Sequence, residues 1–182
     1  KDLTKADAPF VAMATDMDYM YSPIEVLDDN IYIMTNYGAP RYRIMVTTPD
    51  RPALKDWTEL VAEGDAVLSG AQVIGGKLLL TYDKDASNHA YVYGLDGRME
   101  HEIKLPALGS VGFSGDKNDK ECFFTFTSFT IPSSTYKYDI DNNTYTLLRA
   151  PKVGFNADDF ITEQVFYPSK DGTRIPMSIT YK

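Results

Sequence analysis

Few residues in this sequence combine a type and a spacing that could carry catalysis. The 182 residues hold two histidines, His89 and His101, and one cysteine, Cys122. A Ser–His–acid triad needs a nucleophilic serine, which in many hydrolases lies in a G-x-S-x-G turn between a strand and a helix. The nearest string, GFSGD around Ser114, lacks the final glycine. We therefore interpret Ser114 as part of an ordinary turn and predict no catalytic residue in this sequence.

The histidines and the cysteine fit structural roles better than catalytic ones. His89 begins a predicted strand beside a turn, and His101 lies between two glutamates in an edge-like strand, so both are interpreted as exposed strand histidines. Cys122 starts an apolar strand and has no basic neighbour to lower the pKa of its thiol. We interpret it as a buried structural thiol, and a single cysteine forms no internal disulfide.

Acidic residues recur at predicted turns and are interpreted as turn residues rather than ligands. The string Asp139-x-Asp141-x-Asn143 begins like a calcium loop, but Thr144 replaces the glycine of such loops and Ala150 replaces the final glutamate. We predict no metal and no cofactor. Asn142-Asn143-Thr144 matches a glycosylation triplet, which matters only in a eukaryotic secretory setting.

The charge balance excludes some classes of partner. With 18 Lys and Arg against 26 Asp and Glu, the formal net charge is −8, and the basic residues are scattered. A nucleic-acid footprint needs a clustered basic face, so no nucleic-acid partner is predicted. No apolar run approaches the ~18 residues of a membrane helix, and the first nine residues lack the apolar centre of a signal peptide. We expect a soluble protein, cytoplasmic or periplasmic.

The elements that hold these residues are predicted to be short β-strands. Aromatic residues make up 13% of the chain, and they suit the half-buried surface of a sheet. The best helical candidate is 53–64, but Trp57–Val61 alternates equally well as a strand, and we favour the strand. Gly75-Gly76 and Asp96-Gly97 supply the positive φ angles that tight hairpin turns require.

A four-strand order recurs three times, in units near 19–64, 65–108 and 109–150. The second strand of each unit starts near Ile31, Leu78 and Cys122, which are 47 and 44 residues apart. Four antiparallel strands in about 40–50 residues are typical of a β-propeller blade, although an evenly spaced all-β sandwich stays an alternative. Because propellers close with about 4–8 blades, three blades predict an open arc. Such an arc belongs to a larger protein or associates with other copies through uncovered apolar surface.

The C-terminal part of the chain resembles a known family. QVFYPSKDGTRIPM, residues 164–177, is similar to the entry into the catalytic domain of prolyl oligopeptidases. GSVGFSG at 109–115 and FTFTSF at 124–129 resemble the last propeller blade of that family. Tyr19, Pro40-Arg41-Tyr42-Arg43 and Trp57 fit its earlier blades more loosely.

The resemblance implies a serine peptidase that cuts short peptides after proline. In that family an α/β-hydrolase domain holds a Ser–Asp–His triad. A seven-bladed propeller covers this domain and limits the size of the substrate. Residues 1–155 would be a partial propeller, and residues 156–182 a linker and the first β-hairpin of the catalytic domain. The triad would then lie beyond Lys182, so the resemblance transfers no site residue and the 182 residues alone would be inactive. The end of the sequence in strand-like alternation also favours a cut fragment.

The implied partners are the missing blades and catalytic domain of the parent chain, and short proline-containing peptides. Self-association through open blade edges is a further expectation. The net charge would favour basic peptides through electrostatic steering. Two other functions stay open: a non-catalytic propeller segment that binds a peptide or protein partner, and a sugar-binding β protein.

Overall fold

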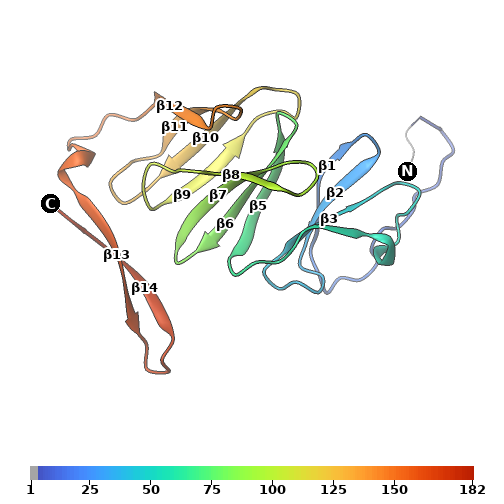
Figure 1. Cartoon of the computed structure of the whole chain (residues 1–182), viewed down its shortest axis with the longest axis horizontal. Helices are drawn as coiled ribbons and strands as arrows, with labels where there is room; N and C mark the ends of the chain where they lie inside the picture. The colour runs from blue at the N-terminus through green and yellow to red at the C-terminus, as the bar shows by residue number, and fades with distance from the viewer. Residues whose placement is uncertain (1–3) are drawn as a thin grey trace. The chain divides into compact units, whose positions relative to one another are not determined.

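The regular secondary structure of the chain is almost entirely β-strand (Figure 1). The computed structural model describes residues 4–182, and within this range fourteen strands form four antiparallel sheets. Backbone contacts divide the chain into two compact units, one up to Leu68 and one from Ser69 onward. Three of the sheets have four strands in sequence order, and the fourth is a two-stranded hairpin. The prediction of an all-β fold with three four-stranded sheets and a C-terminal hairpin is confirmed.

The first unit holds one sheet. Its strands are β1 (Tyr21–Leu27), β2 (Asn30–Thr35), β3 (Arg43–Thr47) and β4 (Thr58–Val61). Its core packs Trp57 against Ile33 and Met45. A 3₁₀ turn at Leu54–Asp56 precedes β4, so the strand is confirmed over the helix at this position.

The third strand of this sheet begins directly after a tyrosine in an unusual backbone conformation. The φ of Tyr42 is +67°, in the left-handed region that a bulky side chain rarely adopts. Its N–H donates to the carbonyl of Ala39 at 2.8 Å, and the carbonyl of Arg41 accepts from the N–H of Leu68 at 2.9 Å. These bonds hold the chain in a turn up to Tyr42 and delay the strand to Arg43.

The second unit holds the other two four-stranded sheets. The second sheet contains β5 (Val67–Ile74), β6 (Lys77–Lys84), β7 (Ser87–Tyr93) and β8 (Met99–Ile103). The third contains β9 (Ser110–Ser114), β10 (Glu121–Thr127), β11 (Ser134–Asp139) and β12 (Thr144–Arg149). Figure 1 shows the second and third sheets side by side, coloured from green to orange.

These two sheets share one apolar core. On β10 every second residue is buried, and Phe124 stacks on Tyr136 of β11 with ring centroids 4.9 Å apart and an interplanar angle of 12°. The same core takes Leu79 and Val92 from the second sheet. Because successive residues of a strand point to opposite faces, alternation along β10 and β11 dedicates one face of the third sheet to this contact.

The other face of the third sheet is polar. It presents Glu121, Phe123, Thr125 and Thr127 from β10, and all four are exposed. The exposed aliphatic residues of this sheet lie instead on its edge strand β12, at Leu147 and Leu148. The apolar surface that the sequence predicts at an open blade is therefore concentrated on an edge rather than spread over a face.

The hairpin β13 (Ile161–Pro168) and β14 (Arg174–Tyr181) stands apart from the four-stranded sheets. It follows a 3₁₀ turn, Ala157–Asp159, whose N-terminus is capped by the Asn156 side chain. Neither strand has a buried residue, and Nε2 of Gln164 donates to the carbonyl of Asp85 in the β6–β7 turn at 2.6 Å. An isolated two-stranded hairpin is only marginally stable in water, so this one needs further packing to persist.

Of the residues described, none forms a helix long and apolar enough to cross a membrane.

The Gly75-Gly76 turn between β5 and β6 also fixes the two sheets of the second unit together. The N–H of Gly75 donates to the carbonyl of Asp116 at 3.0 Å, and that of Gly76 to the carbonyl of Lys117 at 2.8 Å. Both glycines have positive φ, +59° and +70°. A Cβ on Gly75 would lie 2.5 Å from the carbonyl oxygen of Asp119, whereas a Cβ on Gly76 would meet nothing within 4 Å.

We therefore predict unequal effects for two neighbouring alanine substitutions. Gly76→Ala should lower the free energy of unfolding by about 1 kcal/mol, because it adds only backbone strain. Gly75→Ala should cost more than about 2 kcal/mol, because the new Cβ also forces the 115–119 loop away from the turn. Urea denaturation followed by circular dichroism measures both, and equal losses would contradict the role of the Asp119 contact.

Candidate functional sites

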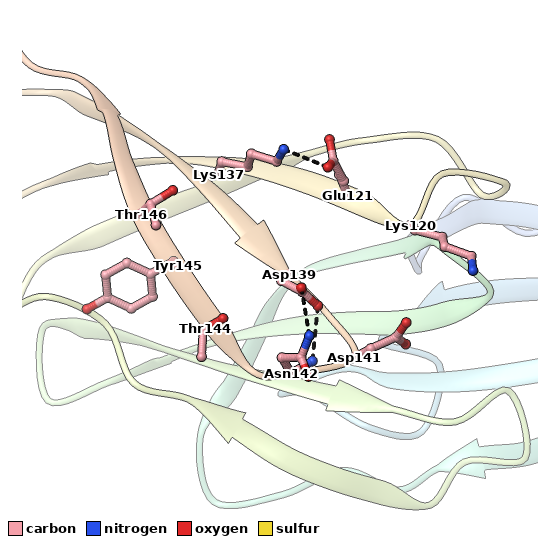
Figure 2. A pocket seen from close by; sticks show the side chains of 9 residues that line it. All are labelled: Lys120, Glu121, Lys137, Asp139, Asp141, Asn142, Thr144, Tyr145 and Thr146. Atoms are coloured by element: carbon pink, nitrogen blue, oxygen red, sulfur yellow. Dashed lines mark hydrogen bonds and ion pairs between the residues drawn. The ribbon is translucent and has the colours of Figure 1, made fainter.

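An open pocket of about 400 Å³ lies at one end of the third sheet. The ends of β10, β11 and β12 and the turn between the last two strands line it, and Figure 2 labels all nine lining residues. Two lysines, three carboxylates, an asparagine and three hydroxyl side chains contribute to its wall. Neither histidine nor the cysteine of the chain lies among the nine, so the pocket holds no Ser–His or Cys–His pair.

One ion pair and one set of turn hydrogen bonds engage three of the five charged side chains of this pocket. Nζ of Lys137 lies 2.6 Å from Oε1 of Glu121, and the Asp139 carboxylate accepts from the backbone N–H and the Nδ2 of Asn142 at 3.0 and 2.8 Å (Figure 2). These hydrogen bonds from Asn142 hold the pKa of Asp139 below its usual value. With these partners, the Asp139 carboxylate stabilises the turn between β11 and β12.

The calcium-like string is divided between two sides of the hairpin. Asp139 bonds to Asn142, whereas the side chain of the exposed Asn143 contacts the hydroxyl of Tyr138. Across residues 4–182 no group of three or more His, Cys, Asp or Glu side chains is gathered closely enough to hold a metal ion. The interpretation of these acids as turn residues agrees with their hydrogen bonds, and the absence of a metal stays a prediction.

His101 is half-buried rather than exposed, which corrects the expectation from the sequence. Its Nε2 lies 3.0 Å from the hydroxyl of Tyr138, a residue of the third sheet that has no exposed surface. The Tyr138 hydroxyl donates to Oδ1 of Asn143 at 2.9 Å, and Nδ2 of Asn143 donates to the carbonyl of Glu102 at 3.2 Å. This polar network joins β8 of the second sheet to the hairpin of the third.

The network fixes the proton positions. Because Nδ2 of Asn143 must donate to a carbonyl, its Oδ1 is the atom that accepts, and the single proton of the Tyr138 hydroxyl goes to that oxygen. Nε2 of His101 must therefore carry a hydrogen and donate to Tyr138. Burial raises the pKa of Tyr138, so the hydroxyl stays protonated at neutral pH. A histidine whose Nε2 donates in this way cannot use that nitrogen as a general base.

The remaining candidates, Cys122, Ser114 and His89, also lack the surroundings of a catalytic residue. Cys122 is fully buried in the shared core, and burial raises the pKa of its thiol to about 12. Ser114 is exposed at the end of β9, where it pairs with Phe123. His89 is also half-buried rather than exposed, and its Nδ1 lies 3.6 Å from Oε1 of Glu102. Within residues 4–182 neither histidine forms a hydrogen bond with a serine or a thiol, so no Ser–His or Cys–His pair exists at these positions.

The Tyr138 network predicts a measurable stability difference between two tyrosines. Tyr138→Phe should lower the free energy of unfolding by about 1–3 kcal/mol, because it removes both hydrogen bonds of a fully buried hydroxyl and leaves the half-buried Nε2 of His101 without its partner. Tyr145→Phe is the matched control: its ring also packs on Phe124 and Tyr136, and its hydroxyl has no hydrogen-bond partner among the described residues. The control should change stability by less than about 0.5 kcal/mol. Equal values from chemical denaturation would contradict the network.

Comparison with known proteins gives a consistent family. The sequence model described as "Prolyl oligopeptidase, N-terminal beta-propeller domain" matches residues 1–151. A prolyl endopeptidase from Elizabethkingia meningoseptica is 35% identical over 183 residues, a match that covers 100% of this chain and 26% of the relative. A prolyl oligopeptidase from Omphalotus olearius is 38% identical over 156 residues, covering 82% of this chain and 21% of the relative.

Solved structures agree with these sequence matches. A structure from a study of two prolyl endopeptidases has a TM-score of 0.83 at 32% identity and covers 93% of this chain and 25% of that chain. Prolyl oligopeptidase B from Galerina marginata, in its apo form, has a TM-score of 0.83 at 24% identity, which is a likeness of fold. The chain spans about a quarter of the length of the curated relatives it matches.

Proposed function

The chain belongs to the prolyl oligopeptidase family, and on that premise we propose that it is part of a serine endopeptidase that hydrolyses short peptides after proline. The match of residues 1–151 to the N-terminal propeller domain carries the proposal. The relatives that match the whole chain are prolyl endopeptidases about four times as long. The 182 residues contain no G-x-S-x-G string, in agreement with a portion that precedes the nucleophile.

The proposed division of the chain follows its sheets. Residues 1–155 would be a partial propeller with blades near 19–64, 65–108 and 109–150, and residues 156–182 a linker and the first hairpin of an α/β-hydrolase domain. Two observations support this division: the family match ends at residue 151, and β13–β14 has no buried residue of its own. A hairpin of that kind is stabilised when further strands or helices cover it.

The role proposed for these blades is steric. A ring of rigid blades above an active site admits thin, flexible peptides and rejects folded proteins, and rigidity requires that neighbouring blades do not slide. The shared core of the second and third sheets and the Tyr138 network across them supply such rigidity. The partners proposed for the chain are thus the remaining blades, the catalytic domain and short proline-containing peptides.

Hydrolysis of a proline-containing peptide tests this proposal. The 182 residues alone should release no product from a chromogenic substrate with proline before the scissile bond, whereas the parent protein should cleave it. The coding sequence after Lys182 should contain G-x-S-x-G followed by an aspartate and a histidine, the order of α/β-hydrolases. Cleavage after proline by the 182 residues alone, or a downstream sequence without that order, would overturn the proposal.

We also propose that the isolated chain self-associates through the edge strand β12. This strand presents unpaired backbone groups on one side, and Leu147 and Leu148 are 58% and 61% exposed. An apolar edge strand is a ready site for pairing with another chain, and a lysine on it opposes such pairing.

Leu148→Lys should therefore reduce the association measured by sedimentation velocity over a range of protein concentrations. Met99→Lys is the matched control, because Met99 is also exposed on an edge strand, β8 of the second sheet, and the substitution adds the same charge. If both substitutions reduce association equally, net charge rather than the β12 edge is responsible. Sedimentation as a monomer at every concentration would contradict self-association.

A further inference from the structure

Four aromatic rings of the first unit form a chain of contacts that begins at the surface. Tyr19 and Tyr37 meet edge to face with centroids 5.1 Å apart, and both are partly exposed, at 42% and 38%. Tyr37 lies 6.4 Å from Tyr21, which meets the buried Trp57 edge to face at 5.8 Å. The two outer rings are therefore open to a ligand, while the two inner rings fix them to the core of the sheet.

A carboxylate lies beside these rings. The Tyr21 hydroxyl donates to Oδ2 of Asp16 at 2.9 Å, and Oδ1 of Asp16 is buried with no hydrogen-bond partner among the described residues. Burial, the hydrogen bond to Asp16 and its negative charge raise the pKa of Tyr21 to about 12, and the phenols of Tyr37 and Tyr19 contribute to the same shift. Asp16 is thus linked to the two exposed rings through Tyr21, which contacts both the carboxylate and the ring of Tyr37.

The cation that contacts the Tyr37 loop has an acidic partner of its own. Nη1 of Arg43 lies 2.9 Å from Oε2 of Glu59, and its Nη2 donates to the carbonyl of Tyr37 at 2.8 Å. Arg43 is thereby matched by Glu59 and positions the Tyr37 loop. On the other side, the N–H of Met20 donates to Oδ1 of Asn36 at 2.7 Å, which ties the segment after Tyr19 to the same loop. The two exposed rings are held in place before any ligand arrives.

We propose that Tyr19 and Tyr37, with the Asp16 carboxylate linked to them through Tyr21, form a docking site for a cationic side chain, arginine or lysine, of a peptide. Aromatic faces attract cations, and the attraction grows with a negative charge in the same region. Arginine is the better fit, because its planar guanidinium stacks on aromatic rings. The net charge of −8 raises the local concentration of basic peptides around the whole chain, but it does not itself select these rings.

This proposal goes beyond the cleavage of peptides and does not depend on it. Binding at the rings of the first unit is measured on the 182 residues, in which the proposed function predicts no catalysis. A failure to bind would leave the peptidase proposal untouched, and a failure to find a catalytic domain downstream would leave the docking site untouched.

Two matched probes test the site. Acetyl-Gly-Arg-Gly-amide and its citrulline counterpart have nearly the same shape and differ in charge. The fluorescence of Trp57, the only tryptophan of the chain, follows binding because its ring contacts Tyr21. The arginine peptide should bind saturably with a millimolar dissociation constant, and the citrulline peptide at least about fivefold more weakly. Equal affinities for the two probes would overturn the proposal.

Three variants distinguish this site from general attraction to an acidic protein. Tyr19→Leu removes an exposed ring and Asp16→Asn removes the charge, so each should weaken arginine-peptide binding by at least about threefold. Tyr167→Leu, an exposed tyrosine of the hairpin, is the control and should leave binding unchanged. Circular dichroism checks that Asp16→Asn folds, and Tyr19→Leu lies before the first strand. If Tyr19→Leu binds the arginine peptide as tightly as the unmodified chain does, the rings are not the site. The same conclusion follows if Tyr167→Leu weakens binding as much as Tyr19→Leu does.

Discussion

The fold depends on a single constraint, which is that an apolar face of a four-stranded sheet must be covered from water. The second and third sheets meet this constraint by sharing a core, to which Leu79 and Val92 contribute from one side and Phe124 and Tyr136 from the other. Burial of each large side chain contributes about 1.5–3 kcal/mol, so a few such residues outweigh any one polar contact. Neighbouring sheets therefore pack against each other, and each contact requires an apolar face on both sheets.

The polar network of Tyr138 adds specificity to this non-directional packing. Apolar faces can slide past each other with little loss, whereas His101, Tyr138 and Asn143 satisfy one another in only one relative position of the two sheets. The Gly75-Gly76 turn acts in the same sense at another point of the interface, through its hydrogen bonds to the 116–117 carbonyls. Together they define the register in which the two sheets meet.

The sequence predicted an element well where the residue types directly reflect the backbone conformation. An apolar run from Cys122 indicated β10, alternation indicated β13–β14, and the paired glycines identified the β5–β6 turn. The Asp28-Asp29 and Asp85-Ala86 turns carry the same positive φ angles without glycine, so the acids there were recognised as turn residues only by default. The partner of His101 is 37 residues away in another sheet, and no local pattern reports such a contact. The same holds for Tyr37, which the β2–β3 loop brings into contact with Tyr19 and Tyr21.

The donor role of His101 has a consequence for sequence change over evolutionary time. The Tyr138 oxygen needs a hydrogen from this position and has none to return, because its own proton is committed to Asn143. Glutamine, which can present an N–H at a similar reach, would be an acceptable replacement. An ionised glutamate would instead place a second hydrogen-bond acceptor against the Tyr138 oxygen. Selection at position 101 should thus act on the direction of one hydrogen bond rather than on the imidazole ring, even though histidine is the residue that most readily suggests catalysis.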